Sequence, residues 1–158
     1  MTEVPGGVPA GAASLRLEVY AHRRYRDGRA DRILQSLCRA FSPAVHGCRI
    51  VDVFLFRGIP SLTPEIASEV FCDAVAQEMI RDGHAAGQSF PGEWDFLVEV
   101  TARPGVTDPV ALTAREALRV CLAQGVPPGG LIQTAVQYLV SVGPGLPVDA
   151  GELARFFH

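Results

Sequence analysis

The stretch EVTARPGVTDPVALTAREAL, residues 99–118, decides how this chain is expected to fold. Apolar and polar residues alternate at its start, which favours a strand, and Pro104-Gly105 then favours a tight turn. Asp108 can accept hydrogen bonds from the free N–H groups of a helix whose first residue is Pro109. The stretch therefore predicts a strand, a stiff turn and a capped helix.

A second stretch, VYAHRRYRDGRADRILQSL at residues 19–37, has the same layout with an arginine-rich turn. The two copies align without a gap at an offset of 81 residues, with these matches: Glu18 with Glu99, Val19 with Val100, Ala21 with Ala102, Asp27 with Asp108, Ala30 with Ala111, and Leu37 with Leu118. Further along, FLF at 54–56 answers YLV at 138–140. A fixed period of this kind predicts an internal duplication.

The first copy is expected to contain two strands and two helices. Its first strand should be half-buried, with Leu15, Leu17, Val19 and Ala21 inward and Arg16, Glu18, Tyr20 and His22 outward. A helix with apolar residues from Ala30 to Phe41 follows, and then CRIVDVFLFRG at 48–58 predicts a strand covered on both faces. Thr63 and Pro64 begin a second helix, expected to end near Gly83.

The second copy repeats this order. Its strand should turn Phe96, Val98, Val100 and Ala102 inward, and its helix should bury Val110, Ala114, Ala117, Leu118 and Cys121. After a rigid connector, GVPPGG at 125–130, a strand should carry Ile132, Val136, Tyr138, Val140 and Val142 on one face. Asp149 and Glu152 predict a capping box for a helix that contains Leu153, Phe156 and Phe157.

The fold class expected from this pattern is α+β, with two tandem β-α-β-α units and a mixed sheet covered by helices. We predict a disordered leader at 1–13, a first repeat at 14–82, a linker at 83–93 and a second repeat at 94–158. The two repeats are expected to form one structural domain, since 158 residues suffice for a sizeable core.

The amino-acid composition argues against several classes of function. The formal net charge of -3 argues against nonspecific binding of nucleic acid, which needs excess basic charge. All 14 basic residues are Arg, so a Schiff-base lysine or a P-loop lysine is excluded. The sequence has neither an apolar run of membrane-spanning length nor the pattern of a signal peptide, which predicts a cytoplasmic protein with no membrane partner.

A search for catalytic patterns gives no catalytic, cofactor-binding or metal-binding residue. The four cysteines show no C-x-x-C spacing and are predicted to be buried free thiols: Cys38, Cys48, Cys72 and Cys121. The four His residues lack metal-ligand spacing, and there is no G-x-S-x-G. The connector at 125–130 precedes a strand, so it lacks the helix N-terminus that would make it a phosphate loop.

Two features are candidate partner interfaces. The turn at 22–29 carries Arg23, Arg24 and Arg26, whose guanidinium groups could bind an oxyanion, although a solvated turn is the simpler interpretation. Near the end of the chain, Phe156 and Phe157 are adjacent aromatic residues that need cover. Either the core of the domain provides that cover or the chain is a piece of a longer protein.

The stretch at 99–118 also resembles the PurS-like small-subunit domain of phosphoribosylformylglycinamidine synthase. In that family a V-x-V strand is followed by a G-V-x-D-P turn and an amphipathic helix, and the matching residues are Val98, Val100, Gly105, Val106, Asp108 and Pro109. The closing GELARFFH resembles the start of a small helix that follows in the family. The resemblance covers residues 14–158 through the repeat, but Val110-Ala111 stand where the family often has Gly, and the first copy lacks P-G-V.

The resemblance implies a non-catalytic scaffold domain in purine biosynthesis. The full enzyme is a ligase that amidates formylglycinamide ribonucleotide with ATP and glutamine. In that family ATP, Mg²⁺ and glutamine are handled by synthase and glutaminase domains or subunits, which this domain joins. Long single-chain forms carry two such copies in tandem, equivalent to a dimer of the separate small subunit.

Two other functions stay open at this stage. Repeated α+β units often hold a small effector between copies, which would make the chain a regulatory module. RNA could stack on sheet aromatics, for which the candidates are Tyr20, Phe54, Phe56 and Tyr138, although the acidic charge favours no nucleic-acid partner. Self-association also stays open.

Overall fold

The computed structural model describes residues 14–41, 45–103, 105–144 and 148–157, and the predicted leader at 1–13 lies outside this part. The elements in chain order are β1 (Ser14–Ala21), α1 (Gly28–Ala40), β2 (Val45–Arg57), α2 (Pro64–Phe71), β3 (Gln77–Arg81), α3 (Ala85–Gln88), β4 (Phe96–Thr101), α4 (Pro109–Cys121), β5 (Leu131–Val142) and α5 (Ala150–Phe156). The expected α+β class is confirmed, and the β-α-β-α order occurs twice.

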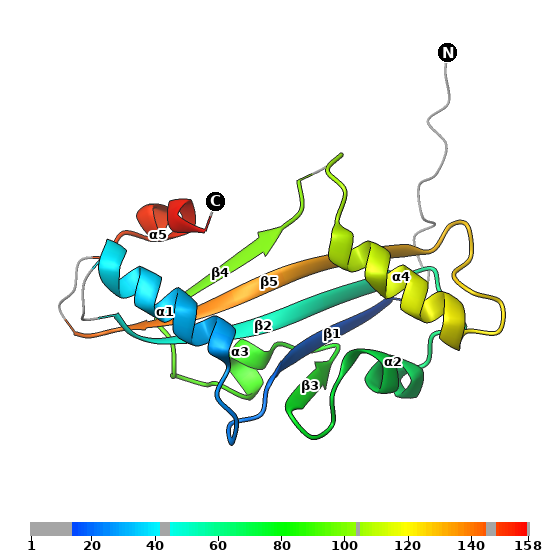
Figure 1. The fold of residues 1–158 in the computed structure, drawn as a ribbon, viewed down its shortest axis with the longest axis horizontal. Coiled ribbons are helices and arrows are strands. Elements are labelled where there is room, and N and C mark those ends of the chain that lie inside the picture. Colours follow the sequence, from blue (N-terminus) through cyan, green and yellow to red (C-terminus); the bar gives the residue numbers. More distant parts are fainter. Residues whose placement is uncertain (1–13, 42–44, 104, 145–147, 158) are drawn as a thin grey trace, which may run out of the picture.

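The described strands form one sheet in the order β3-β1-β2-β5-β4, with the long strands β2 and β5 side by side in the middle (Figure 1). All four pairings are antiparallel, where a mixed sheet was expected. Each repeat is an antiparallel strand pair whose connection carries a long helix. Although α1 and α4 lie in these connections, the strand that follows each helix runs antiparallel beside the strand before it, so the described sheet has no parallel pairing.

The register of the strands relates the two repeats by a twofold-like axis. Glu18 lies opposite Val53 in the first repeat, and Glu99 lies opposite Gln137 in the second. Residues of β1 and β4 are therefore related by an offset of 81, as Glu18 and Glu99 are. Residues of β2 and β5 are related by an offset of 84, as Val53 and Gln137 are. Asp52 and Val136 are also 84 apart and face each other directly, so the axis passes through this pair.

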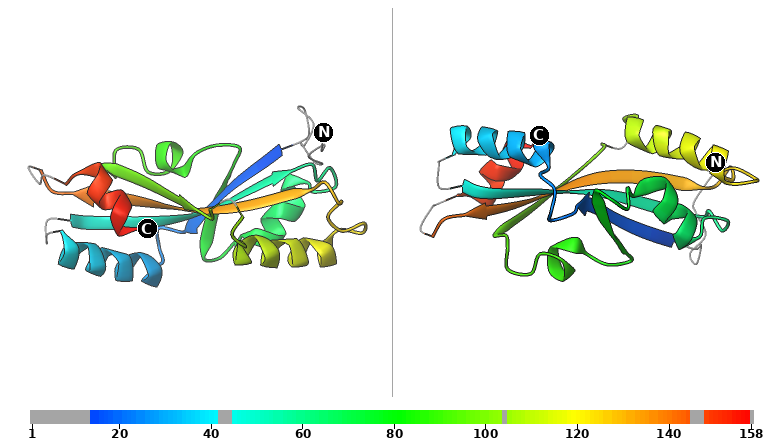
Figure 2. Two further views of the ribbon diagram at one scale, coloured as in Figure 1. Left: turned by 90° about the horizontal axis from the view of Figure 1, so that it is seen from above. Right: turned by 60° about the horizontal axis from the view of Figure 1, so that its bottom comes forward.

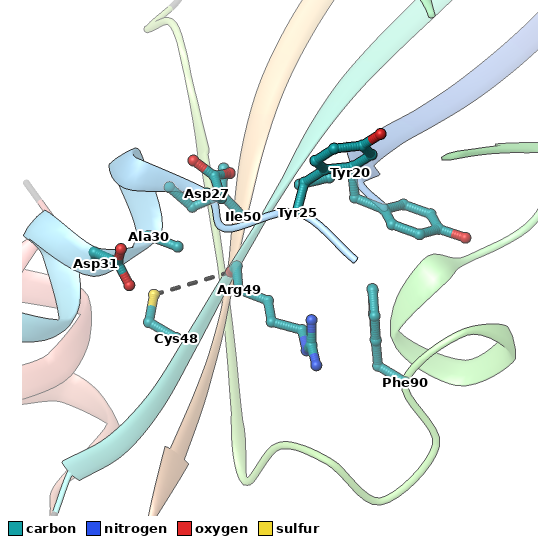
Figure 3. Close-up of a pocket in the computed structure, with 10 residues that line it drawn as sticks. Tyr20, Tyr25, Asp27, Ala30, Asp31, Cys48, Arg49, Ile50 and Phe90 are labelled. Atoms are coloured by element: carbon teal, nitrogen blue, oxygen red, sulfur yellow. Dashed lines mark hydrogen bonds between the residues drawn. The ribbon is translucent and has the colours of Figure 1, made fainter. Parts of the chain in front are cut away.

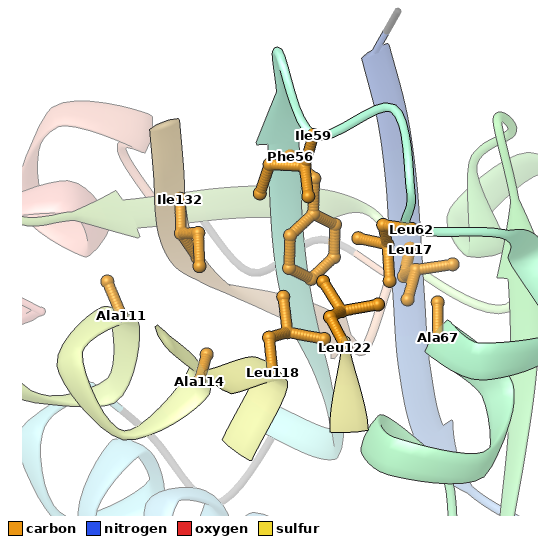
Figure 4. Close-up of a cluster of buried hydrophobic side chains, with 10 residues drawn as sticks. All are labelled: Leu17, Phe56, Ile59, Leu62, Ala67, Ala111, Ala114, Leu118, Leu122 and Ile132. Atoms are coloured by element: carbon orange, nitrogen blue, oxygen red, sulfur yellow. The ribbon is translucent and has the colours of Figure 1, made fainter. Parts of the chain in front are cut away.

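The long helices cover one face of the sheet, which we call the helix face (Figure 2). On that face the α4 residues Ala114 and Leu118 pack against Leu17 and Phe56 of the sheet (Figure 4). At the other end, Leu37 of α1 packs with residues that include Val45, Val140 and Leu153. Leu37 and Leu118, matched by the repeat, are both fully buried.

The opposite face, which we call the back face, is covered by α3 and the residues that follow it (Figure 2). Phe90 packs edge to face on Tyr20, with 5.0 Å between ring centroids (Figure 3). Strand β1 is therefore buried on both faces, and its prediction as a half-buried strand is wrong. Glu18 and Tyr20, expected to face outward, are 0% and 4% exposed because segment 83–93 folds back over them.

The second helix is shorter than predicted and is followed by an additional strand. Thr63 caps α2 as expected, but the helix ends at Phe71 rather than near Gly83. The Asp73 carboxylate accepts hydrogen bonds from the N–H groups of Val75 and Ala76, which offers the backbone a turn instead of a further helical turn. The chain then enters β3, which pairs with β1 along its outer edge.

Some of the predicted burial is also wrong. In α4 the buried residues are Ala111, Ala114 and Leu118, whereas Val110 is half-exposed because the apolar stripe is rotated by one position. Cys121 is exposed at the end of the same helix, against the prediction of a buried thiol. The other three cysteines are partly buried.

The helix starts agree with the predicted caps. Asp27, Thr63, Asp108 and Asp149 each accept a hydrogen bond from a backbone N–H in the first turn of the following helix. Asp108 also bonds the hydroxyl of Thr134 at 2.7 Å and its N–H at 3.1 Å, which ties α4 to β5. Desolvation opposes ionisation of Asp108, but the hydrogen bonds from Ala111 and Thr134 outweigh it and lower the pKa of the carboxyl.

Truncation of the two equivalent core leucines should destabilise the fold by comparable amounts. Leu37→Ala and Leu118→Ala each leave a cavity in a fully buried site, and each should lower the free energy of unfolding by about 2 to 5 kcal/mol. Urea unfolding followed by circular dichroism measures this. Val120→Ala, at a position that is 81% exposed, is the control and should change it by less than about 0.5 kcal/mol.

The low-pH stability of the protein should depend on Asp108. Because its folded-state pKa lies below that of an unfolded aspartate, ionised Asp108 stabilises the fold above about pH 4, and the contribution is lost as pH falls through the folded-state pKa. Asp108→Asn should therefore be less stable than the parent at neutral pH, and the difference should narrow below about pH 4. Urea titrations across this range test it. A difference that stays constant would contradict this role of Asp108.

Candidate functional site

Arginine side chains of the turn at 22–29 bind other residues of the same chain. Arg23 donates to the carboxylate of Glu93 at 2.6 Å and to the backbone carbonyl of Ser89, and Arg26 pairs with Asp31. Arg24 is exposed. Two of the three predicted interface arginines therefore hold the turn against neighbouring segments, although Arg23 and Arg26 remain 53% and 84% exposed.

A small cavity of about 100 Å³ lies beside this turn, between the start of α1, strand β2 and Phe90 (Figure 3). Arg49 stacks over the Phe90 ring, 4.6 Å from its centroid, and pairs with Glu93 at 3.2 Å. Burial, with a smaller effect of Asp27, raises the pKa of the Cys48 thiol in this wall to about 12. The thiol therefore stays protonated at neutral pH and is a poor nucleophile.

At the axis between the repeats, Arg29 of α1 binds Asp52 of β2 through two hydrogen bonds of 3.0 and 2.8 Å. This bond to Asp52 is the main reason why the pKa of Arg29 is raised. The repeat-related residues are Val110 and Val136, which are apolar. The ion pair therefore fastens α1 to the centre of the sheet in the first repeat only.

Glu18 is a fully buried carboxylate at the middle of β1. It accepts hydrogen bonds from the backbone N–H of Ala85 at 2.6 Å and from the Arg16 guanidinium at 2.8 and 2.6 Å, and the His84 ring lies at 3.1 Å. These bonds satisfy a charge that would otherwise be costly to bury. They also fix α3 and its flanking residues onto the back face.

Glu99, the repeat-related residue, has a different environment. Its Oε2 atom accepts from Gln137 at 2.8 Å and from Arg16 at 3.4 Å, and its side chain is 40% exposed. Within the described residues no hydrogen bond is found for the Oε1 atom of Gln137, which is buried. Two related glutamates thus lie on one face of the sheet, and a segment of the chain covers only the first.

The outer edge of β4 borders a groove of about 670 Å³, which we call the β4 groove. Its lining residues are Val98, Glu99, Val100, Thr101, Ala102, Arg103, Ala154 and Phe157. Phe157 reaches it from the end of α5, where its ring stacks on Tyr138 with 4.1 Å between centroids. The groove thus combines a strand edge with an aromatic wall.

The two predicted interface features do not come together. Phe156 contacts the rings of Phe41 and Phe157, at centroid distances of 5.9 and 5.0 Å. The arginines of the turn contact residues 89–93 and α1 instead. Both phenylalanines are half-buried, so the core of the domain provides much of the cover that they were expected to need.

The sheet aromatics proposed for RNA stacking are covered by the chain's own side chains. Phe56 and Tyr20 are buried, Phe54 packs on Phe71 at 4.9 Å, and Tyr138 stacks on Phe157. These rings do not form an open stacking platform.

The residues that matter most on the back face were not identified from the sequence as a site. The alignment of the repeats matched Glu18 with Glu99, and an acidic residue at the middle of a predicted strand was the available signal. Its partner, the N–H of Ala85, lies in a segment predicted as a linker, so the pattern gave no sign of contact.

Comparisons with protein-family models, with curated proteins and with solved structures give no match for this chain. Over the described residues, no cluster of three or more His, Cys, Asp or Glu side chains is arranged to hold a metal ion. In the same part of the chain, no helix has the length and apolar character to cross a membrane.

The two equivalent glutamates should respond differently to loss of charge. Glu18→Gln removes the charge and leaves one acceptor oxygen where Ala85 and Arg16 now use two, and it should lower the free energy of unfolding by roughly 3 to 5 kcal/mol. Glu99→Gln, at a partly exposed site, is the matched control and should cost less than about 1 kcal/mol. Urea unfolding compares them. Hydrogen exchange should become faster at residues 84–90 only in Glu18→Gln, and equal effects would contradict the anchoring role.

Proposed function

We propose that this chain is a non-catalytic scaffold domain that holds other polypeptides, and that it serves phosphoribosylformylglycinamidine synthase, as the sequence resemblance implies. In this role it joins the ATP-using synthase and glutaminase domains or subunits and helps to shape the route of ammonia between them. ATP and Mg²⁺ belong to those partners, and no catalytic residue is assigned here. The proposed location is the cytoplasm.

The observation that carries this proposal is the duplicated fold. Two equivalent strand-helix-strand units meet along β2 and β5, as two subunits of a symmetric dimer would. The resemblance implies the same arrangement, since tandem copies in the long forms of the enzyme replace a dimer of the small subunit. The β4 groove and the arginine-rich turn are the surfaces that we assign to partners, and Arg23, Arg24, Arg26, Phe156 and Phe157 stay the candidate contacts.

A reconstitution experiment tests the scaffold role. The full chain is mixed with the separately produced synthase and glutaminase polypeptides from the same cell, and complex formation is measured by light scattering after gel filtration. We expect a complex of defined stoichiometry, and we expect formation of the amidine from glutamine to require the chain while formation from free ammonia does not. Turnover of the ribonucleotide by the chain alone, or glutamine-dependent turnover that is indifferent to it, would contradict the proposal.

A regulatory small-molecule module is the second candidate, and the cavity beside the arginine-rich turn favours it. At about 100 Å³ the cavity has room for a few non-hydrogen atoms, and Arg49 and Asp27 in its wall could orient a polar ligand. It lies between the first repeat and segment 83–93 rather than between the two copies. A thermal-shift screen with amino acids and nucleotides tests this function, because a specific ligand raises the melting temperature by mass action.

A further inference from the structure

The two outer edges of the repeated unit are not equivalent. On β1 the outer edge is paired with β3, which lies antiparallel to the five residues Leu17 to Ala21. The repeat-related residues are Val98 to Ala102, all but Ala102 in β4, and β4 is the last strand of the described sheet (Figure 1). In the first repeat, β3 therefore shows how a strand covers the edge of β1 that is equivalent to the outer edge of β4.

The edge of β4 has the features of a strand-binding site. Residues 96–101 contain no Pro, Lys or Arg, and Glu99 is the one charged residue among them, so most of the devices that block pairing at a sheet edge are absent from this strand. Val98 and Val100 are half-buried toward the helix face, and the β4 groove runs along them to Phe157. In the first repeat, Met79 of β3 lies opposite Val19 and packs into the helix-face core. An apolar side chain in the same position opposite Val100 would enter the groove.

The back face beside β4 has unsatisfied hydrogen-bond acceptors. The Oε1 atom of Gln137 is buried without a partner in the described chain, and Gln137 is only 4% exposed. Glu99 adds a carboxylate, whose hydrogen bonds to the described residues are made at its Oε2 atom. In the first repeat the equivalent carboxylate is satisfied by the N–H of Ala85, which the covering segment supplies. A segment that brings hydrogen-bond donors to Glu99 would be the equivalent, at β4, of the segment that carries Ala85.

We propose that the outer edge of β4 binds an extended strand of a partner polypeptide, antiparallel to β4, in the place that β3 takes in the first repeat. The strand presents an apolar side chain to the β4 groove and places N–H groups, or an arginine or histidine side chain, beside the partly exposed carboxylate of Glu99. Binding adds a sixth strand to the sheet, so backbone hydrogen bonds supply affinity and Glu99 supplies preference for donors. This inference rests on the proposed scaffold function, for which it names a binding site.

The probe for this site is a synthetic peptide with the sequence of residues 77–90, QEMIRDGHAAGQSF, labelled with fluorescein. Fluorescence anisotropy measures its binding to the full chain. We expect saturable binding below millimolar concentration, and we expect the backbone amides of residues 96–101 to gain protection in hydrogen exchange. The peptide with Met79→Pro cannot complete the strand pairing and should bind at least tenfold more weakly, as should a scrambled peptide.

Two substitutions in the chain locate the contact. Glu99→Arg replaces the acceptor by a donor and should weaken peptide binding at least tenfold, as a loss of about 1.4 kcal/mol would. Glu116→Arg makes the same change on the solvent face of α4, where Glu116 is 65% exposed, and should leave binding within twofold. Circular dichroism checks that both variants fold. Equal binding by both variants, no binding of the peptide, or protection outside β4 would overturn the proposal.

The remaining outcomes separate this inference from the scaffold function. A dimer of the chain that Glu99→Arg dissociates would assign the edge to a second copy and overturn the proposal of a different partner. If the reconstituted complex forms and Glu99→Arg leaves it intact, the β4 site fails while the scaffold function stands. If the peptide binds at β4 but the complex does not form, the scaffold function fails in the named enzyme.

Discussion

The pairing of β2 with β5 joins the two repeats into one sheet and supports both long helices. The two strands pair from Val45 opposite Val142 to Arg57 opposite Leu131, and no other pairing joins the first repeat to the second. Each long helix packs on both strands: the α1 cluster contains Val45 and Val140, and the α4 cluster contains Phe56 and Ile132. If the two strands separated, each helix would lose part of the apolar surface on which it packs.

The repeat is close in geometry and unequal in chemistry. At the axis, one side has the ion pair of Arg29 with Asp52, and the other side has valines at both related positions. On the back face, Glu18 is enclosed by α3, while Glu99 stays partly open. The matched positions Leu37 and Leu118 carry the same residue and are both fully buried, whereas the positions at the axis and on the back face differ. The differences are therefore where distinct roles for the two halves are expected.

Local signals in the sequence predicted much of the fold. Asp27, Thr63, Asp108 and Asp149 identify four helix starts, because a capping side chain acts within a few residues of its position. The offset between the copies follows from the same local patterns. What the sequence did not reveal depends on contacts between distant segments: strand β3 pairs with β1 across about 60 residues, and its helix-like apolar spacing concealed it. The contact of Ala85 with the buried Glu18 also joins distant segments, and the sequence did not reveal it for the same reason.

For the surface sites too, the sequence revealed the residue type but not the distant residues that contact it. Arg23 was recognised as a charged side chain in a turn, but its partner Glu93 lies 70 residues away and could not be inferred from spacing. Phe156 and Phe157 were recognised as aromatics that need cover, and the structure supplies Phe41 and Tyr138. The β4 groove had no sequence signal, because an unpaired strand edge depends on the order of strands in the sheet.

The central strand pair also bears on how the chain is made. During synthesis on the ribosome, β2 emerges long before β5, whose last paired residue is Val142. Until then the edge of β2 that will pair with β5 has no partner. Helix α1 can pack on β2 but not yet on β5. Nascent chains in this state are prone to pair with one another through such edges. Because both repeats lie in one polypeptide, the correct partner of β2 arrives on the same chain rather than by diffusion, which shortens that interval.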